Sequence, residues 1–209
     1  SKILNKSMAD IFIISAPSGA RQSSLIDALI EKDSRLKKSV SVTTRLPREG
    51  EQHGQHYVFT DETDFQKRLN NGEFLEHAQV HGNWYGTSKV LFESELTNNN
   101  DLILEIDYQG AQVVRNLYAA SISIFILPPS KALLRSRLEK RNTDNTTTIE
   151  QRLTAASTEI AHISEYRYVI INDNFDDALA DIQAIVRSTR LAAHSHEGER
   201  IVKDFLKDD

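Results

Sequence analysis

Short apolar runs and helical apolar patterns alternate along the chain. Four runs rich in β-branched residues have the length of buried strands, and they cover Ile11–Ser15, Leu102–Ile106, Ile122–Leu127 and Val169–Ile171. After each run, apolar residues recur every three or four positions, which predicts helices around Leu25–Ile30, from about Gln109, over Ser130–Arg141 and from Asp176 to about Ala193. Strands that alternate with helices pair in parallel through right-handed crossovers, so the sequence predicts an open α/β sheet.

Between about residues 40 and 87 the rhythm is different. Shorter segments with alternating apolar and polar positions occur at Tyr57–Phe59 and Phe74–Val80. Glycines that favour turns separate these segments, namely Gly50, Gly54, Gly72 and Gly82. We therefore predict a β-rich insertion in this part of the chain.

The composition fits one globular domain. The chain has 209 residues, of which 39% are hydrophobic, and this is enough for a substantial core. A formal net charge of −5 argues against sequence-independent binding of nucleic acid, which needs many cations facing phosphates. The lack of cysteine excludes disulfides and thiolate metal sites.

No targeting signal or membrane span is evident in the sequence. No apolar run approaches the ~18 residues that cross a bilayer, and Ser1–Ser7 lacks the apolar core of a signal peptide. We therefore predict a cytoplasmic protein without a membrane partner. Met8 is the only methionine and the expected natural start, so residues 1–7 are interpreted as an extension or a remnant of cloning.

The segment Ser15–Leu25 lies where a predicted strand turns into a predicted helix. Backbone N–H groups and a helix N-terminus at such a turn can hold phosphate. The phosphate-binding P-loop has the pattern G-x-x-x-x-G-K-[ST]. Here Ala16 and Arg21 stand at its two glycines, Gln22 stands at its lysine, and Ser23 keeps the hydroxyl position. By itself, the segment fits a degenerate P-loop and an ordinary strand-to-helix turn equally well.

A second segment, Ser41–Tyr57, is more specific, with the sequence S-V-T-T-R-L-P-R-E-G-E-Q-H-G-Q-H-Y. It resembles the GMP-binding stretch of guanylate kinases, the bacterial type of nucleoside monophosphate kinase with a P-loop fold. The resemblance runs from about residue 8 to 192 and continues through Phe74–Ala78, Tyr85–Thr87, Leu104–Gly110 and Ser123–Pro129. On these motifs and their order, the chain is identified as a member of that family.

The resemblance implies a parallel-sheet P-loop kinase core with a small β-rich GMP-binding insertion and a helical lid. The implied boundaries within the domain at 8–209 are 8–39 and 88–136 for the core, 40–87 for the GMP-binding region, about 137–155 for the lid, and 156–209 for the remaining core and the C-terminal helices. The implied reaction is that of a transferase in purine nucleotide metabolism: the γ-phosphate of ATP passes to GMP with Mg²⁺, giving ADP and GDP. No feature of the sequence indicates the oligomeric state.

Two arginines and one glutamate in these motifs suit GMP chemically. Arg45 and Arg48 carry forked donors for the monophosphate. Glu76 can accept the paired N1–H and N2–H donors of guanine, a pair that adenine lacks. The resemblance implies further roles for Tyr57 and Tyr85 at the phosphate, Ser41 and Thr87 at the base, Glu51 in holding the pocket together, and Asp107 between the base and the metal site.

For ATP, the resemblance implies that the P-loop holds the phosphates and that arginines of a lid close over them. The implied residues are Ser18, Gly19, Ala20, Arg21, Ser23 and Ser24 in the P-loop, with the Ser23 hydroxyl on Mg²⁺, and Arg137, Arg141 and Arg152 in the lid. The polar segment Asn142–Thr148 predicts a mobile loop between two helices. Closure of a lid excludes water and brings positive charge to the developing transition state.

Gln22, at the position of the catalytic lysine, predicts impaired turnover. The lysine places a positive charge between the β- and γ-phosphates, and losing a comparable donor costs ~10²- to 10³-fold in rate. Arg21 disfavours the backbone that glycine permits by ~1 to 2 kcal/mol, and its side chain points ~100° away from that of Gln22, so it does not replace the lysine. We predict a chain that binds GMP but turns over slowly. The alternative is a non-catalytic guanylate-kinase-like module that binds nucleotide or protein.

Overall fold

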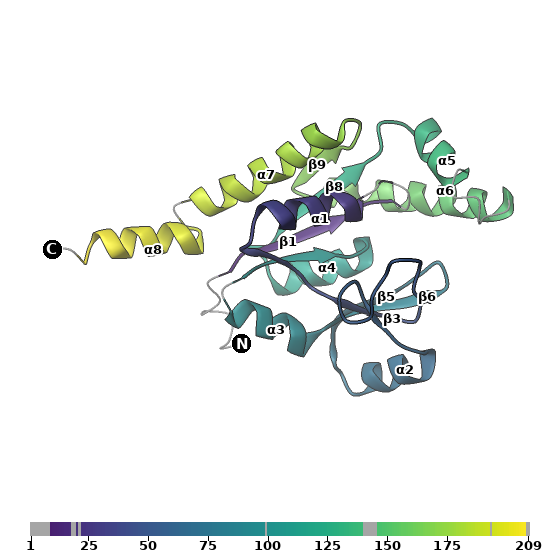
Figure 1. Cartoon of the computed structure of the whole chain (residues 1–209), viewed down its shortest axis with the longest axis horizontal. Helices are drawn as coiled ribbons and strands as arrows, with labels where there is room; N and C mark the ends of the chain where they lie inside the picture. Colours follow the sequence, from purple (N-terminus) through teal and green to yellow (C-terminus); the bar gives the residue numbers. More distant parts are fainter. Residues whose placement is uncertain are drawn as a thin grey trace.

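A five-stranded parallel sheet forms the centre of the molecule (Figure 1). The computed structural model describes residues 9–17, 20, 22–98, 100–139, 146–192 and 194–207. In spatial order the strands are β2 (Leu36–Lys38), β7 (Asp101–Glu105), β1 (Ile11–Ser15), β8 (Ile122–Leu127) and β9 (Tyr168–Ile171). All four pairings are parallel, so the predicted α/β fold with a parallel sheet is confirmed.

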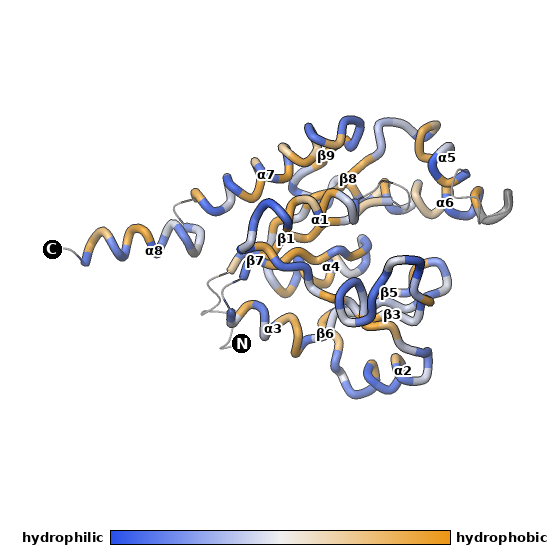
Figure 2. Tube along the Cα trace, viewed as in Figure 1, coloured by the Kyte–Doolittle hydropathy of each residue, from blue (hydrophilic) through white to orange (hydrophobic). Residues whose placement is uncertain are grey.

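Helices cover both faces of this sheet because its central strands are apolar on both sides. The covering helices are α1 (Gln22–Lys32), α3 (Lys89–Thr97), α4 (Tyr108–Leu117) and α7 (Phe175–Leu191). Phe12 and Ile14 of β1 enter the core under α1 and α7, whereas Ile11 and Ile13 enter the core with Phe92 of α3. Successive residues of one strand point to opposite faces, and both faces are buried here. Figure 2 accordingly shows the hydrophobic positions concentrated along the sheet and the helix faces that meet it.

A second, four-stranded sheet lies beside the first. Its strands, in spatial order, are β4 (Val58–Phe59), β3 (Ser41–Thr43), β6 (Asn83–Ser88) and β5 (Phe74–Val80). The β3–β6 and β5–β6 pairs are antiparallel, and β3–β4 is parallel. Helix α2 (Glu62–Asn70) packs on it through Phe65, whose ring stacks on Phe74 with 4.6 Å between centroids. β4 and β5 lie where the alternating pattern predicted strands.

Two further helices follow β8, and one boundary prediction there is wrong. The helices are α5 (Lys131–Glu139) and α6 (Thr146–Ala161). The loop was predicted to reach Thr148, but α6 already begins at Thr146, while residues 142–145 lie outside the described part of the chain. Threonine is a poor helix former, but Ile149 and Ala156 pack against Leu134 and Leu138 of α5, and this burial outweighs the propensity.

The chain ends in the short helix η1 (Ile163–Glu165), then β9 and α7, and then α8 (His196–Phe205), which extends away from the sheet (Figure 1). A buried ion-pair cluster fixes α7 to the amino end of β7. Arg190 donates from Nε to Asp101 over 2.7 Å and from Nη1 to Asp33 over 2.5 Å. Within the described ranges, no helix combines the length and the apolarity needed to cross a membrane.

Candidate functional site

A polar cavity of about 410 Å³ lies between the carboxyl end of the parallel sheet and the four-stranded sheet. P-loop residues Ala20, Gln22, Ser23 and Ser24 line one side of it. Residues of the second sheet and its loops line the other side: Ser41, Arg48, Glu51, Tyr57, Glu76 and Tyr85. Asp107 also lines the cavity, directly after β7. In parallel α/β folds, this edge of the sheet is where ligands bind.

Of the nine residues that were predicted to bind GMP, all but Arg45 and Thr87 line this cavity. These two lie behind it and bond to residues that do line it. Thr87 donates its hydroxyl to Oε1 of Glu76 over 2.5 Å. Arg45 donates from Nη2 to Oε1 of Glu51 over 2.8 Å. The fold therefore brings together a set of residues that is spread over 67 positions of sequence, from 41 to 107.

Ser41 and Glu76 line one end of the cavity, and strand pairing sets them in a row with Thr87, which lies behind the lining. Ser41 of β3 is opposite Thr87 of β6, and Glu76 of β5 is opposite the same threonine. Side chains at directly paired positions share one face of a sheet. All three residues are buried, and Glu76 is only 5% exposed. A ligand that reaches this row must satisfy a desolvated carboxyl group.

Burial raises the pKa of Glu76 to about 7. The hydrogen bond from Thr87 opposes this rise, while the negative charge of Asp107 adds to it. The carboxyl group therefore changes charge near neutral pH, unlike a glutamate in water. A ligand that presents N–H donors would favour the ionised form.

Gly110 of α4 leaves the space that the Glu76 carboxyl group occupies. A Cβ at this position would overlap Oε2 of Glu76 and lie 2.9 Å from its Cδ. The N–H of Gly110 also donates to Oδ1 of Asp107 over 3.0 Å, so Asp107 caps α4. The sequence motif contained this glycine, but its steric role depends on β5 and was not predicted.

Arginines and tyrosines gather at the other end of the second sheet. Arg45 lies over the Tyr57 ring, with its guanidinium carbon 5.3 Å from the ring centroid, and the centroid of Tyr85 is 6.1 Å from that of Tyr57. Glu51 accepts from Arg45 and, through Oε2, from the backbone N–H of Arg48 over 2.7 Å. This cluster of two cations and two phenols suits a doubly charged phosphate.

The charges at this end hold Glu51 ionised. Burial raises its pKa, but the hydrogen bonds from Arg45 and from the Arg48 N–H, together with the charges of both arginines, outweigh burial and lower it overall. Burial raises the pKa of Tyr57 further above its usual range, and the nearby charge of Glu105 acts in the same direction. Tyr57 therefore stays a hydrogen-bond donor at physiological pH.

On the P-loop side, one carboxylate holds two side chains. Glu105, the last residue of β7, accepts from Nε2 of Gln22 over 3.1 Å and from the Ser23 hydroxyl over 2.5 Å. The buried amide of Asn172 donates to the Ala20 carbonyl over 3.0 Å and positions the loop backbone. Ser18, Gly19 and Arg21 lie outside the described residues, so their predicted phosphate contacts remain predictions.

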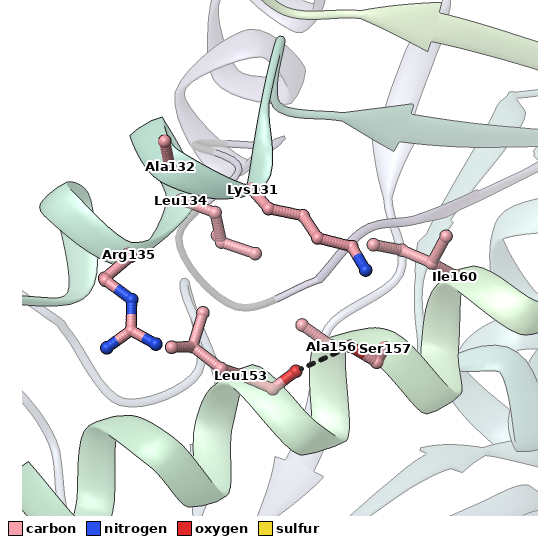
Figure 3. A pocket seen from close by; sticks show the side chains of 8 residues that line it. All are labelled: Lys131, Ala132, Leu134, Arg135, Leu153, Ala156, Ser157 and Ile160. Carbon is pink, nitrogen blue, oxygen red and sulfur yellow. Dashed lines mark hydrogen bonds between the residues drawn. The ribbon is translucent and has the colours of Figure 1, made fainter.

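Of the predicted lid arginines, the two that the structure describes do not line this cavity. Arg137 is on α5 and Arg152 on α6, and within the described part of the chain neither lines it; Arg141 lies outside that part. Figure 3 shows a second hollow, of about 200 Å³, into which Leu134 of α5 and Leu153 of α6 point. The ion pair of Arg135 with Glu150, at 2.6 Å, also joins these two helices. Their arrangement as a closing lid stays a prediction.

Glu159 of α6 was not singled out from the sequence, yet it lines the first cavity. Burial raises its pKa to about 7, and the charge of Asp107 contributes. Its sequence context is that of an amphipathic helix, where a glutamate normally faces solvent. Only the position of α6 over the cavity reveals it.

The fold and site define a class of protein: an α/β domain of the P-loop type, in which one polar cavity lies between the loop after the first strand and a second, smaller sheet. The guanylate kinase family model matches residues 8–189. A guanylate kinase from Methylobacillus flagellatus is 55% identical over 87% of this chain and 90% of its own length. One from Shewanella frigidimarina is 46% identical over 95% of this chain and 98% of its own length.

A solved structure agrees with these sequence relatives. The crystal structure of guanylate kinase from Anaplasma phagocytophilum superposes with a TM-score of 0.75 at 34% identity, covering 94% of both chains. The chain belongs to the guanylate kinase family, as the motifs predicted.

Proposed function

We propose that this chain transfers the γ-phosphate of ATP to GMP, giving GDP and ADP. One observation carries the proposal: a single cavity joins the Ser41–Thr87–Glu76 row, which suits guanine, to the P-loop side chains of Gln22 and Ser23. Arg48, Tyr57 and Tyr85 line the same cavity, and Arg45 lies behind them, so a phosphate between these ends would be held by this cluster. The family relatives named guanylate kinase support the same reaction.

The residues of this chain would act mainly by positioning and by charge. Direct displacement needs no covalent intermediate, so catalysis depends on alignment of the two phosphates and on neutralisation of their charge. The Ser23 hydroxyl and the Glu105 carboxylate are hard oxygen donors of the kind that Mg²⁺ prefers, and the metal would neutralise the β- and γ-phosphates. The lid at about 137–155, with Arg137, Arg141 and Arg152, would add positive charge on closing.

Turnover is proposed to be slow, because Gln22 offers only a neutral amide on the P-loop. In the structure that amide bonds to Glu105, so the side chain is held within reach of the phosphate site but carries no charge. The second candidate function is a guanylate-kinase-like module that binds nucleotide or protein without catalysis. The same neutral amide is the observation that favours it.

A coupled assay of ADP formation with GMP, AMP or IMP as acceptor tests the proposal. The expected result is slow turnover with GMP and none with AMP. Binding of GMP in calorimetry without any ADP formation would support the non-catalytic module instead. Failure of GMP to bind would contradict both the site and the proposed reaction. A cytoplasmic location and a role in purine nucleotide metabolism follow from the proposed reaction, with GMP and ATP as the partners.

GMP binding is expected to weaken at acid pH because of Glu76. Its pKa of about 7 means that the ionised acceptor is present above that pH and is lost as the pH falls. Each pH unit below the pKa should cost about tenfold in GMP affinity from this group. Calorimetry from pH 5.5 to 8.5 measures this.

The titration of Glu76 must be separated from that of its neighbours. Glu159 lines the same cavity and burial raises its pKa to about 7, and the phosphate of GMP itself titrates near pH 6. Glu76→Gln removes the titration of residue 76 alone. The difference in the pH dependence of GMP affinity between this variant and the unmodified chain therefore reports Glu76. Identical profiles for the two proteins would contradict the assignment.

Gly110→Ala is expected to raise KM for GMP by about tenfold while leaving the fold as stable as before. The new Cβ must displace the Glu76 carboxyl group, whereas alanine improves helix propensity by ~1 kcal/mol. Steady-state kinetics and thermal unfolding measure the two effects. Ala111→Gly is not a suitable control, because Ala111 is buried in the core, so the unmodified chain serves as the reference. An unchanged KM for GMP would show that Glu76 does not need this space.

A further inference from the structure

We propose that Lys38 supplies the counter-charge of the P-loop in this chain. In this role it neutralises Glu105, the carboxylate that holds Gln22 and Ser23, and so allows a triphosphate to approach a P-loop without a lysine. Lys38 acts through Glu105 and is therefore a positioning residue. The inference rests on the proposed ATP site and adds to it a residue outside the P-loop.

Strand order places Lys38 at the phosphate edge of the sheet. It is the last residue of β2, which pairs in parallel with β7, and Glu105 is the last residue of β7. β7 in turn pairs with β1, from which the P-loop leaves the sheet. The Nζ of Lys38 forms an ion pair with Oε2 of Glu105. The two side chains are 18% and 6% exposed, so water screens this pair only partly.

The other oxygen of Glu105 faces the P-loop. Oε1 accepts from Gln22 and from Ser23, and the carboxylate lines the cavity in which the phosphates of ATP are proposed to bind. In the absence of Mg²⁺, a negative charge at this place repels a triphosphate unless a cationic side chain compensates it. Gln22 brings none. Among the described residues, Lys38 is the one cation that is ion-paired with Glu105.

A P-loop lysine would make Lys38 redundant. The Gln22 amide nitrogen is 3.1 Å from Glu105, and lysine at this position would bring an ammonium group to the same neighbourhood. Among the described residues, the positive charge beside Glu105 comes from Lys38 on the neighbouring strand. The charge is present at the edge of the site, but it is set back behind Glu105 and does not lie between the β- and γ-phosphates. This arrangement supports binding of ATP without restoring fast transfer.

The same pair also borders the GMP side of the cavity. The Nζ of Lys38 is 5.8 Å from the centroid of the Tyr57 ring, and the charge of Glu105 contributes, after burial, to the raised pKa of Tyr57. Glu105 thus influences both subsites. Removal of its counter-ion is therefore expected to affect both, with the larger effect on the more highly charged ligand.

The test is ATP binding to the full chain, measured by calorimetry in EDTA so that Mg²⁺ does not contribute. Lys38→Met is expected to weaken ATP binding by about tenfold, the scale of one partly screened charge. Lys37→Met removes the same charge from the neighbouring, exposed position of β2 and is expected to leave ATP binding unchanged. Equal ATP affinity of Lys38→Met and the unmodified chain would overturn the proposal. Thermal unfolding verifies that each variant is folded.

Two double variants distinguish a role of Lys38 as the counter-ion of Glu105 from direct contact of Lys38 with the phosphates. Adding Glu105→Gln to Lys38→Met removes the charge that needs compensation, so ATP affinity should return toward that of the unmodified chain. Adding Gln22→Lys should also restore it, because the new ammonium takes over the same role. If neither change restores binding, Lys38 does not act through Glu105 and the proposal is wrong.

These measurements are independent of phosphoryl transfer. If the chain fails to phosphorylate GMP but shows the expected loss and rescue of ATP binding, the proposed reaction falls and the role of Lys38 stands. If the chain phosphorylates GMP but Lys38→Met binds ATP as tightly as the unmodified chain, the proposed reaction stands and the role of Lys38 is refuted.

Discussion

Replacing Arg21 with glycine and Gln22 with lysine is expected to raise kcat for transfer from ATP to GMP by about 10²- to 10³-fold. Position 22 is the first residue of α1, and its side chain already points to Glu105 beside Ser23, on the P-loop side of the cavity. An ammonium group there can neutralise the negative charge on the phosphates in the transition state, whereas a neutral amide cannot. KM for GMP is expected to stay the same, because the residues proposed to bind GMP lie outside the P-loop.

The two single variants separate the contributions of positions 21 and 22 to the expected rise in kcat. Gln22→Lys restores the charge alone, and Arg21→Gly restores only the freedom of the loop backbone. Glu31→Gln is the matched control, because it changes the net charge by the same amount at the exposed far end of α1. The coupled assay of ADP formation measures all five proteins: the unmodified chain, the double variant, the two single variants and the control. Equal kcat for the unmodified chain and the double variant would refute the proposed impairment.

The strands that the sequence predicted well are those in which burial on both faces produces a continuous apolar run. β8 occupies exactly the predicted Ile122–Leu127, and all but its last residue are buried. β2 and β3 were not predicted, since they are three residues long and carry polar side chains. In β3 the buried Ser41 lines the cavity, and the buried Thr43 donates its hydroxyl to the Trp84 carbonyl over 2.9 Å. The apolar pattern that identifies a buried strand is therefore absent there.

The candidate site shows the same division between local and long-range information. Motif resemblance was sufficient to select Glu76, Tyr57 and Asp107, which the fold brings to one cavity. The roles of Lys38 and Glu159 could not be predicted, because each depends on a neighbour brought near only by strand order or helix placement. A lysine at a strand end and a glutamate on an amphipathic helix both have the sequence appearance of surface residues.

Glu76→Gln is expected to lower kcat/KM for GMP by about 10²- to 10³-fold. An ionised carboxylate can accept both the N1–H and the N2–H of guanine, and hydrogen bonds to charged groups are worth ~1.5 to 3 kcal/mol each. Glutamine has a single oxygen and turns an N–H₂ donor toward the second guanine donor, so one bond is lost and a buried group is left unpaired. The structure makes this costly, since position 76 is 5% exposed and water has little access to it.

The expected loss is specific for guanine, and this distinguishes it from general damage to the pocket. IMP lacks the 2-amino group and so loses less than GMP when Glu76 is changed; the preference for GMP over IMP should therefore shrink. The Arg21→Gly, Gln22→Lys protein is the suitable background, because its turnover is expected to be fast enough to measure large losses.

Glu73→Gln is the matched control for this change. Glu73 is exposed and lies just before β5, so the same chemical change should leave the preference for GMP unaltered. If Glu76→Gln lowers kcat/KM for GMP and IMP equally, the carboxyl group maintains the structure of the pocket but does not recognise the 2-amino group of guanine. The hydrogen bond from Thr87 makes that outcome physically possible, because glutamine keeps only one acceptor oxygen and Thr87 would compete with the ligand for it. The preference for GMP over IMP decides between the two roles.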